Sequence, residues 1–412
     1  MTTTVTRASA GFIAIYALGY VGAYIALITP VATTLALKVG ELDPAGKETS
    51  LGLISAIGAL VAIVSNALSG ALSDRTRSGL GRRRPWILGG ALGGVVALAI
   101  VGFAPTLVVA TLGWILAQLT LNWVLAALQA LLPDQVPLEQ RARVSAVLGI
   151  SQQVSPLVGI GIAFGVQAAG GGIGLMFLVP GIVGAVMLCI LVALIRDVPH
   201  EDAGPFVFRE FIRAFRIEKG KRYDFGWAWF GRFFVILGFA VYTTYQVYFI
   251  GDRLGVPTDQ VVLIQLYALL IFSAVLTVSA VISGRLSDRT GRRKPFVFAS
   301  AAIVGVGLGM LALTYSLPFF FVSAAVMGVG IGAFFAVDLA LLTDVLPDKE
   351  HTAAKDMGIF NIANSLPQSV APAIAPLFLA IGGGGNYSAL FIAGGVFAVL
   401  GAALIAPIRA VK

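Results

Sequence analysis

The sequence predicts an all-α membrane protein in which twelve transmembrane helices form two six-helix pseudo-repeats. Three observations lead to this fold class. Hydrophobic residues make up 58% of the 412-residue chain and charged residues only 12%, about half the charged share of an ordinary soluble domain. The apolar residues fall in stretches of about 20, the length that a helix needs to cross a hydrocarbon core of about 30 Å. Short motifs also recur in the two halves of the chain at a nearly constant separation.

Charge clusters and Pro/Gly positions divide the apolar residues into twelve predicted spans. The first stretch starts near Ala10 and continues to Leu37, which is too long for a signal peptide, so we expect it to be retained. The 49 glycines favour a bundle, because small residues let membrane helices approach closely. The first six spans cover residues 10–37, 50–73, 86–103, 106–132, 144–168 and 174–195. The second six cover 225–250, 260–283, 295–314, 318–343, 357–380 and 388–407.

Lysine and arginine are distributed unevenly between the two sides of the predicted membrane. Of the 28 such residues, only Lys38, Lys47 and Arg253 fall in loops on one side, and Arg232 falls inside a span. The others lie on the opposite side, which the positive-inside rule makes cytoplasmic. We therefore expect a multi-pass protein of the cell (inner) membrane with both termini in the cytoplasm. This topology accounts for the net charge of +8, so no nucleic-acid partner is indicated.

A charged segment in the middle of the chain separates the two halves. We predict an N-terminal six-helix half over residues 1–195, a cytoplasmic linker over 196–224 and a C-terminal six-helix half over 225–412. In the linker, apolar residues recur at helical spacing between arginines from Phe208 to Arg216. This pattern predicts an amphipathic helix that either lies on anionic lipid or packs under the bundle.

Motifs that recur in the same order relate the two halves. The segment SGALSDR at 69–75 returns as SGRLSDR at 283–289, and LLPDQVP at 131–137 returns as LLTDVLP at 341–347. The separation is about 210 residues each time, which indicates a six-helix unit used twice. Parallel repeats joined by a linker are typical of rocking transporters, which hold a small-molecule substrate at the interface between the repeats.

The loop after the eighth predicted span carries a family signature. Residues 284–293 read GRLSDRTGRR, which fits the G-x-x-x-D-R-x-G-R-R signature of major facilitator superfamily transporters. The first-half copy, GALSDRTRSGLGRRRP at 70–85, is longer. That longer loop, together with FAVDLALLTDVLP at 335–347, resembles the glycoside–pentoside–hexuronide cation symporters and the plant sucrose–proton symporters. The resemblance implies the major facilitator fold and secondary active transport by alternating access, with no cofactor.

The sequence also bears on the energy source. Sodium-coupled sugar symporters of this group have acidic residues in span 2, whereas this chain has none between Leu51 and Ser73. We therefore expect protons rather than sodium ions as the coupling partner. The glycine runs at 170–172 and 382–385 lack a P-loop lysine, so ATP-driven transport is not indicated. His200 and His351 fall in predicted loops without a cluster of ligands, so we expect neither an enzyme nor a metal site.

Aspartates at the cytoplasmic ends of spans 2 and 8 are candidates for a gate. A carboxylate there can meet the positive end of a helix and an adjacent arginine. The resemblance implies that Asp74 and Asp288 close the cytoplasmic side of an outward-facing state, and we expect Arg75 and Arg289 as their partners. The alternative is that the arginines only hold the loops inside. The predicted gate residues are Asp74, Arg75, Arg83, Asp288, Arg289 and Arg293.

Two ionisable residues fall inside predicted spans, where a charge is costly. At 1.5 Å per residue, Arg232 lies about 12 Å from the cytoplasmic end of span 7, and Asp338 lies about 9 Å from that of span 10. The similar depths predict an ion pair. Protonation of Asp338 or substrate binding would break the pair and so couple proton movement to transport. The alternative is a fixed structural pair.

Uncharged polar residues on spans 1, 4, 5, 7 and 11 point to the kind of substrate. Tyrosine and amide side chains supply donors, acceptors and flat apolar faces, which suit a neutral, polyhydroxylated ligand such as a sugar. Hydrogen bonds between helices are the alternative role. The predicted cavity residues are Tyr20, Tyr24, Gln118, Asn122, Gln152, Gln153, Tyr242, Gln246, Asn361 and Asn364. We expect a monomer that imports a sugar or glycoside with protons; the competing prediction is a proton-antiport exporter of drug-like or metabolite molecules.

Overall fold

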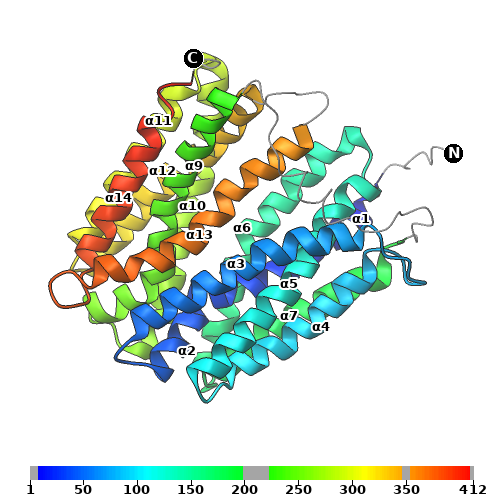
Figure 1. Cartoon of the computed structure of the whole chain (residues 1–412), viewed down its shortest axis with the longest axis horizontal. Helices are drawn as coiled ribbons and strands as arrows, with labels where there is room; N and C mark the ends of the chain where they lie inside the picture. Colours follow the sequence, from blue (N-terminus) through cyan, green and yellow to red (C-terminus); the bar gives the residue numbers. More distant parts are fainter. Residues whose placement is uncertain (1–7, 198–221, 346–352, 409–412) are drawn as a thin grey trace. The chain divides into compact units, whose positions relative to one another are not determined.

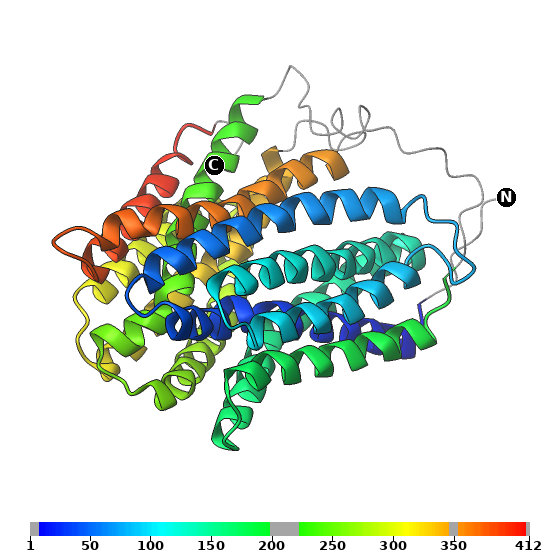
Figure 2. The same cartoon turned by 60° about the horizontal axis from the view of Figure 1, so that its bottom comes forward.

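The computed structural model describes residues 8–197, 222–345 and 353–408, and the predicted linker helix at 208–216 lies outside them. Contacts divide the chain into two compact units, one of Met1–Ser50 with Ile57–Phe208 and the other of Leu51–Ala56 with Arg209–Lys412. Figures 1 and 2 show long helices joined by short loops in each unit. Within the described residues, the β-structure is limited to one isolated bridge between Ser78 and Gly81.

Six spans build the first unit, and the first of them contains a π-helical turn. Helix α1 packs against α6 and α7, and α4 packs against α5 and α7. Pro30 begins the π turn η1, which continues directly into α2. The elements are α1 (Ala10–Thr29), η1 (Pro30–Thr34), α2 (Leu35–Leu42), α3 (Lys47–Ser73), α4 (Arg84–Gly102), α5 (Leu107–Gln135), α6 (Leu138–Ala168) and α7 (Ile173–Leu194).

The second unit repeats this arrangement. Helix α9 packs against α13 and α14, and α11 packs against α12 and α14, as their counterparts do in the first unit. A π turn, η2, again follows the first helix. The elements are α9 (Arg222–Tyr248), η2 (Phe249–Arg253), α10 (Thr258–Thr290), α11 (Lys294–Ala312), α12 (Leu317–Val345), α13 (Ala353–Leu379) and α14 (Tyr387–Ala403).

Glycine pairs mark equivalent helix crossings in the two units. A Cβ atom on Gly22 of α1 would lie 2.7 Å from the carbonyl oxygen of Gly184 on α7. In the second unit, Gly238 of α9 and Gly394 of α14 meet in the same way, backbone against backbone. Each glycine of the second pair lies slightly more than 200 residues after its counterpart in the first. The crossing therefore places α1 in register with α9, and α7 with α14, as the sequence repeat predicts.

Each of the twelve predicted spans is a helix in the structure, which confirms the predicted fold class. By length and composition, ten helical segments within the described residues could each cross a membrane, and α14 is a shorter apolar helix. Helix α6 begins at Leu138 rather than at 144, and α10 continues to Thr290 rather than to 283. Hydropathy marks only the apolar part of a helix, whereas the polar ends of α6 and α10 remain helical beyond it.

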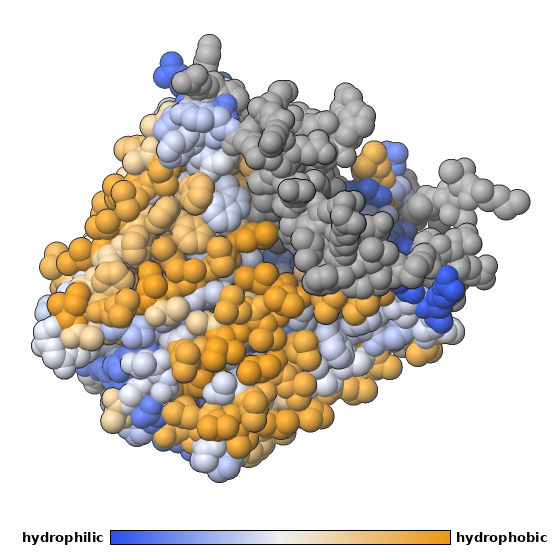
Figure 3. Space-filling model, viewed as in Figure 1, coloured by the Kyte–Doolittle hydropathy of each residue, from blue (hydrophilic) through white to orange (hydrophobic). Residues whose placement is uncertain are grey.

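Exposed apolar residues lie along the outer faces of the helices. On α4, Leu92, Val96 and Ile100 follow one another at four-residue steps, and Ile392 and Val396 do so on α14. Residues at this spacing share one face of a helix. Figure 3 shows hydrophobic residues over much of the visible surface. Such apolar faces are suited to contact with lipid tails, because the tails are as apolar as the side chains themselves.

Candidate functional site

The two charges predicted inside the membrane form an ion pair in the second unit. Arg232 of α9 donates a hydrogen bond through Nη1 to Oδ2 of Asp338 on α12. Both residues are buried, with 9% of Arg232 and 1% of Asp338 exposed. Two opposite charges in contact offset part of the large desolvation cost that each would carry alone. The depths estimated from the sequence therefore identified two residues that do meet.

Side chains of α13 complete the surroundings of Arg232. Its Nε donates to Oδ1 of Asn364 at 3.3 Å. The guanidinium carbon lies 4.9 Å from the ring centroid of Phe360 and 5.9 Å from that of Phe335 on α12. An aromatic face within about 6 Å attracts a cation. The charged group of α9 is thus held by side chains from α12 and α13 together.

The first unit has an uncharged contact at the equivalent place. Tyr16 of α1 donates its hydroxyl proton to the backbone carbonyl of Leu128 on α5 at 2.5 Å. Leu128 precedes Asp338 by the same interval that relates the LLPDQVP and LLTDVLP motifs, and Tyr16 precedes Arg232 by the interval between Gly22 and Gly238. The two units therefore share the position of this contact but not its chemistry. Tyr16 lies four residues before Tyr20, on the same face of the first span as the predicted cavity residues Tyr20 and Tyr24.

In the loop between α3 and α4 of the first unit, Arg83 is the centre of a polar network. Its guanidinium donates to Asp74 at 2.5 Å, to Asp134 at 2.8 Å and to Ser73 at 2.9 Å. Arg82 also pairs with Asp134, at 2.5 Å. Burial alone lowers the pKa of Arg83, but its hydrogen bonds and attraction to Asp134 and Asp74 outweigh that effect and raise the pKa. The network keeps this arginine charged and fixes it to the ends of α3 and α5.

The carboxylate of Asp197 secures the start of α4 in the same unit. It accepts hydrogen bonds from the backbone N–H groups of Arg83 at 2.5 Å and of Arg84 at 2.9 Å. The first N–H groups of a helix have no partner within it, and a carboxylate there also meets the positive end of the helix dipole. Gly81, at φ 101°, turns the loop in the left-handed region next to this carboxylate. The longer loop is thus tied to the end of α7.

The shorter loop of the second unit repeats the central part of this network. Arg293 pairs with Asp288 at 2.6 Å and donates to Ser287 at 3.0 Å. Ser287 donates to the carbonyl of Arg292 at 3.1 Å, as Ser73 does to that of Arg82 at 3.4 Å. Both serines directly precede the aspartate in the repeated motif, but neither was among the predicted gate residues. The additional residues of the first loop therefore leave the Ser–Asp–Arg contact unchanged.

Both aspartates pair with an arginine that comes later in the chain than the expected Arg75 and Arg289. Asp74 forms an ion pair with Arg83, and Asp288 forms one with Arg293. Arg75 donates to the carbonyl of Ala71 at 3.0 Å, and Arg289 is exposed at the end of α10. Successive residues of a helix point about 100° apart, so an adjacent arginine is directed away from the aspartate while the returning loop brings the later one back.

The polar cavity candidates make local contacts in the structure. Asn122 donates to the backbone oxygen of Gln118 at 2.7 Å and to its side-chain oxygen at 3.2 Å, and both residues are buried on α5. Gln246 donates to the hydroxyl of Tyr242 at 2.9 Å on α9. Each of these hydrogen bonds joins two residues of the same helix.

The remaining candidates differ in exposure. The rings of Tyr20 and Tyr24 stack with centroids 6.0 Å apart along α1. On α6, Gln152 is half-buried and Gln153 is exposed. The side chain of Asn361 lies outside the described residues. A role of these residues in substrate binding stays a prediction.

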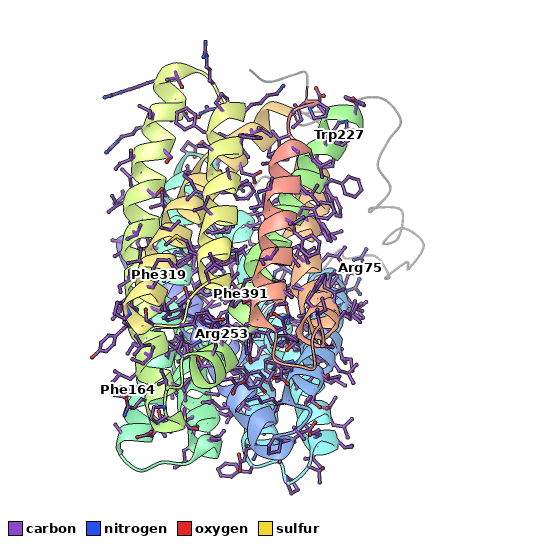
Figure 4. All side chains as sticks on the ribbon, turned by 90° about the vertical axis from the view of Figure 1, so that its left-hand side faces the viewer. Arg75, Phe164, Trp227, Arg253, Phe319 and Phe391 are labelled. Atoms are coloured by element: carbon purple, nitrogen blue, oxygen red, sulfur yellow. The ribbon has the colours of Figure 1, made fainter. Side chains whose placement is uncertain are left out.

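A second polar cluster, which the sequence analysis missed, lies at the other end of α9. Tyr387 donates to Asp252 at 2.7 Å, and Arg253 donates to Ser388 at 2.9 Å. The guanidinium carbon of Arg253 lies 3.8 Å from the ring centroid of Tyr315. Figure 4 shows Arg253 beside Phe391 of α14, far along the unit from Trp227. The π turn η2 is therefore fixed to the start of α14 and to the loop before α12.

Comparison with known protein families decides the assignment. The model of the Major Facilitator Superfamily matches residues 8–278 and, in a second alignment, residues 228–411. This chain belongs to the Major Facilitator Superfamily. It is accordingly a membrane transporter and not an enzyme. A search of curated proteins gives no match. The finer resemblance to the glycoside and sucrose symporters stays a prediction.

Solved structures of other transporters share the major facilitator fold of this chain. A point mutant of the nucleoside transporter NupG superposes with a TM-score of 0.75 at 14% identity, over 97% of this chain and 100% of that one. NupG itself gives 0.72 at 13% identity, over 96% and 98%. A bacterial homolog of the human lysosomal transporter Spinster, in an inward-facing and occupied conformation, gives 0.70 at 16% identity, over 96% and 94%. At these identities the likeness concerns the fold alone.

Proposed function

We propose that this member of the Major Facilitator Superfamily imports a sugar or glycoside together with protons, by alternating access. The observation that carries the proposal is the buried pair of Arg232 and Asp338, in a helix bundle whose described residues otherwise bury few charges. A buried ion pair is a weak source of stability compared with apolar residues of similar size. Two charges inside the spans α9 and α12 are therefore better explained by a role in transport.

Coupling follows from the electrostatics of the pair. Protonation of Asp338 removes the negative charge that Arg232 faces, so the attraction between α9 and α12 weakens. The guanidinium cannot lose its own proton, because arginine stays charged in proteins. Asp338 is consequently the group that would carry the proton. The contact of Arg232 with Asp338 would then depend on whether Asp338 is protonated. We infer that proton binding and substrate binding both favour the state in which the pair is open.

The cytoplasmic networks supply the gate in this proposal. Asp74 with Arg83, and Asp288 with Arg293, occupy equivalent places at the ends of α3 and α10. We propose that both aspartates stabilise the outward-facing state, in which the cytoplasmic side is closed. Their repetition in the two units supports a shared mechanical role, because a topological signal alone requires only the arginines.

The proposed substrate is neutral and polar. The tyrosines and amides of α1, α5, α6, α9 and α13 offer hydrogen bonds and flat rings without net charge. NupG is described as a nucleoside transporter, and since a nucleoside contains a sugar, nucleosides belong in the test panel. We further propose a monomer in the cell (inner) membrane with both termini in the cytoplasm.

The test is uptake into proteoliposomes of a panel of mono- and disaccharides, with two nucleosides, with and without an imposed pH gradient. The proposal predicts that one panel member is accumulated with the gradient and carries protons inward. Asp338→Asn should abolish driven uptake while retaining exchange of labelled for unlabelled substrate. Unchanged driven uptake in Asp338→Asn would exclude the coupling role. Proton release against substrate movement would favour the antiport exporter instead.

A further inference from the structure

Arg232 and Asp338 differ in the number of side chains that each contacts. Within the described residues, the side chain of Asp338 hydrogen-bonds only to Arg232. Arg232 has further supports in the amide oxygen of Asn364 and the ring of Phe360. When Asp338 is protonated, the guanidinium therefore keeps two of its attachments. If the guanidinium moves, in contrast, Asp338 loses its partner altogether.

Of the additional supports, Asn364 and the nearer ring, Phe360, come from one face of α13. Phe360 and Asn364 are four residues apart, so their side chains lie one above the other on the helix. Phe360 is 3% exposed. The amide of Asn364 is neutral and accepts from Nε, which leaves Nη1 directed to Asp338. An acceptor of this kind orients the guanidinium without replacing the carboxylate as its counter-charge.

The first unit lacks both the charge and this support. Gln153 of α6 stands before Pro156 as Asn364 stands before Pro367 of α13, yet Gln153 is exposed and Asn364 is half-buried. The contact at the equivalent place in that unit, from Tyr16 to Leu128, is uncharged. The supporting amide therefore accompanies the charged pair and is not a general feature of the repeat.

Resting on the proposed coupling role of Asp338, we propose that Asn364, assisted by Phe360, is a positioning residue that holds the Arg232 guanidinium against Asp338. Through this contact Asn364 sets the pH at which Asp338 takes up its proton. Asn364 itself neither carries the proton nor provides a counter-charge. A determinant of the pH response therefore lies on α13, a helix that carries neither member of the ion pair.

Other titratable groups near α12 do not share this role. Those on the helices packed against it, within the described residues, are Tyr223, Asp224, Tyr242, Tyr245 and Tyr248 on α9, Asp259, Tyr267, Arg285, Asp288 and Arg289 on α10, and Lys294 on α11. Among the described side chains, Arg232 is the one that pairs with Asp338. Removal of Asn364 therefore acts on the titration of Asp338 through one guanidinium.

The test needs no substrate. The C=O stretching band of a protonated carboxyl group is followed by infrared difference spectroscopy of the purified full-length protein over a pH series, and the Asp338 band is assigned by its loss in Asp338→Asn. In Asn364→Ala the midpoint of this band should move to higher pH by about 1 unit, a part of the ~1–3 units that a close opposite charge contributes. The shift arises because a guanidinium held less closely favours the ionised carboxylate less.

Phe360→Leu should move the midpoint in the same direction by a smaller amount. Leu377→Ala is the matched control, because Leu377 is a 70% exposed residue of the same helix; its midpoint should equal that of the wild type. Circular dichroism and gel filtration establish that each variant is folded. A midpoint in Asn364→Ala that stays unchanged, or moves to lower pH, overturns the positioning role.

Different results would contradict the coupling role of Asp338 and the positioning role of Asn364. If Asp338→Asn leaves driven uptake intact, the coupling role is wrong whatever the midpoint of Asn364→Ala. If Asp338→Asn abolishes driven uptake and Asn364→Ala leaves the midpoint where it was, only the positioning role is wrong. If both effects occur, the pH at which driven uptake is half-maximal should also rise in Asn364→Ala.

Discussion

Arg83 holds Asp74 through a contact of 2.5 Å that closes the loop between α3 and α4. The same guanidinium reaches Asp134 near the end of α5. Asp74 is therefore not an isolated group at a helix end but one member of a network joining α3, α4 and α5.

Neutralising the gate aspartate should shift the protein toward the inward-facing state. In Asp74→Asn the carboxylate that Arg83 contacts is lost, and the ion pair becomes a weaker hydrogen bond from the guanidinium to a neutral amide. We expect cytoplasmic positions to become several-fold more reactive toward a thiol reagent, measured with single cysteines in a Cys189→Ser background. Asp259→Asn, which alters an exposed acid at the start of α10, is the control. Equal labelling in both variants would contradict the gating role.

Replacing one member of the buried ion pair should destabilise the protein more than replacing both members. Arg232→Leu leaves Asp338 buried without its counter-charge, which costs about 3–5 kcal/mol when the charge cannot be relieved. The double variant Arg232→Leu with Asp338→Leu removes both charges, so its thermal stability in detergent should recover most of the loss. Thermal unfolding of the single and double variants measures the difference. A double variant as unstable as Arg232→Leu would mean that packing, rather than charge, explains the loss.

The glycine crossing of α9 and α14 should tolerate no side chain. A Cβ atom at Gly238 would collide with the carbonyl oxygen of Gly394, so Gly238→Val forces the helices apart. We expect a loss of about 1–3 kcal/mol, typical of overpacking, seen as a lower unfolding temperature. Gly226→Ala on the same helix is the control, since no atom lies within 4 Å of a Cβ there. If both variants unfold at the same temperature, the close crossing is not required.

Tyr16→Phe tests the uncharged counterpart in the first unit. The variant removes the hydroxyl that donates to the carbonyl of Leu128 and leaves the ring in place. We expect a loss of about 1 kcal/mol, the net value of one hydrogen bond. The pH dependence of uptake should stay that of the wild type, because no titrating group is involved. A shift of that pH dependence would show that the first unit also takes part in proton coupling.

The sequence predicted the large features because each rests on a strong physical constraint. Apolar length identifies a span, and two charges at one depth of a membrane have few partners except each other, so Arg232 and Asp338 could be paired from the sequence. Asp74 with Arg83 could not be paired in that way, because the path of a loop decides which arginine returns to the helix end. The support from Asn364 was missed for a related reason: α13 carries neither charge, and only the packing shows which of its amides faces Arg232.

The π turns η1 and η2 have a consequence for how the first helix of each unit is interpreted. A π turn places one more residue in the turn than an α-helix does, so residues beyond it are rotated by about 100° relative to an uninterrupted helix. A helical wheel drawn through Ala10–Leu42 as one α-helix therefore assigns the residues of α2 to the wrong side. Deletion of a single residue from η1 would turn all of α2 about its own axis, whereas a conservative substitution there would leave its direction unchanged.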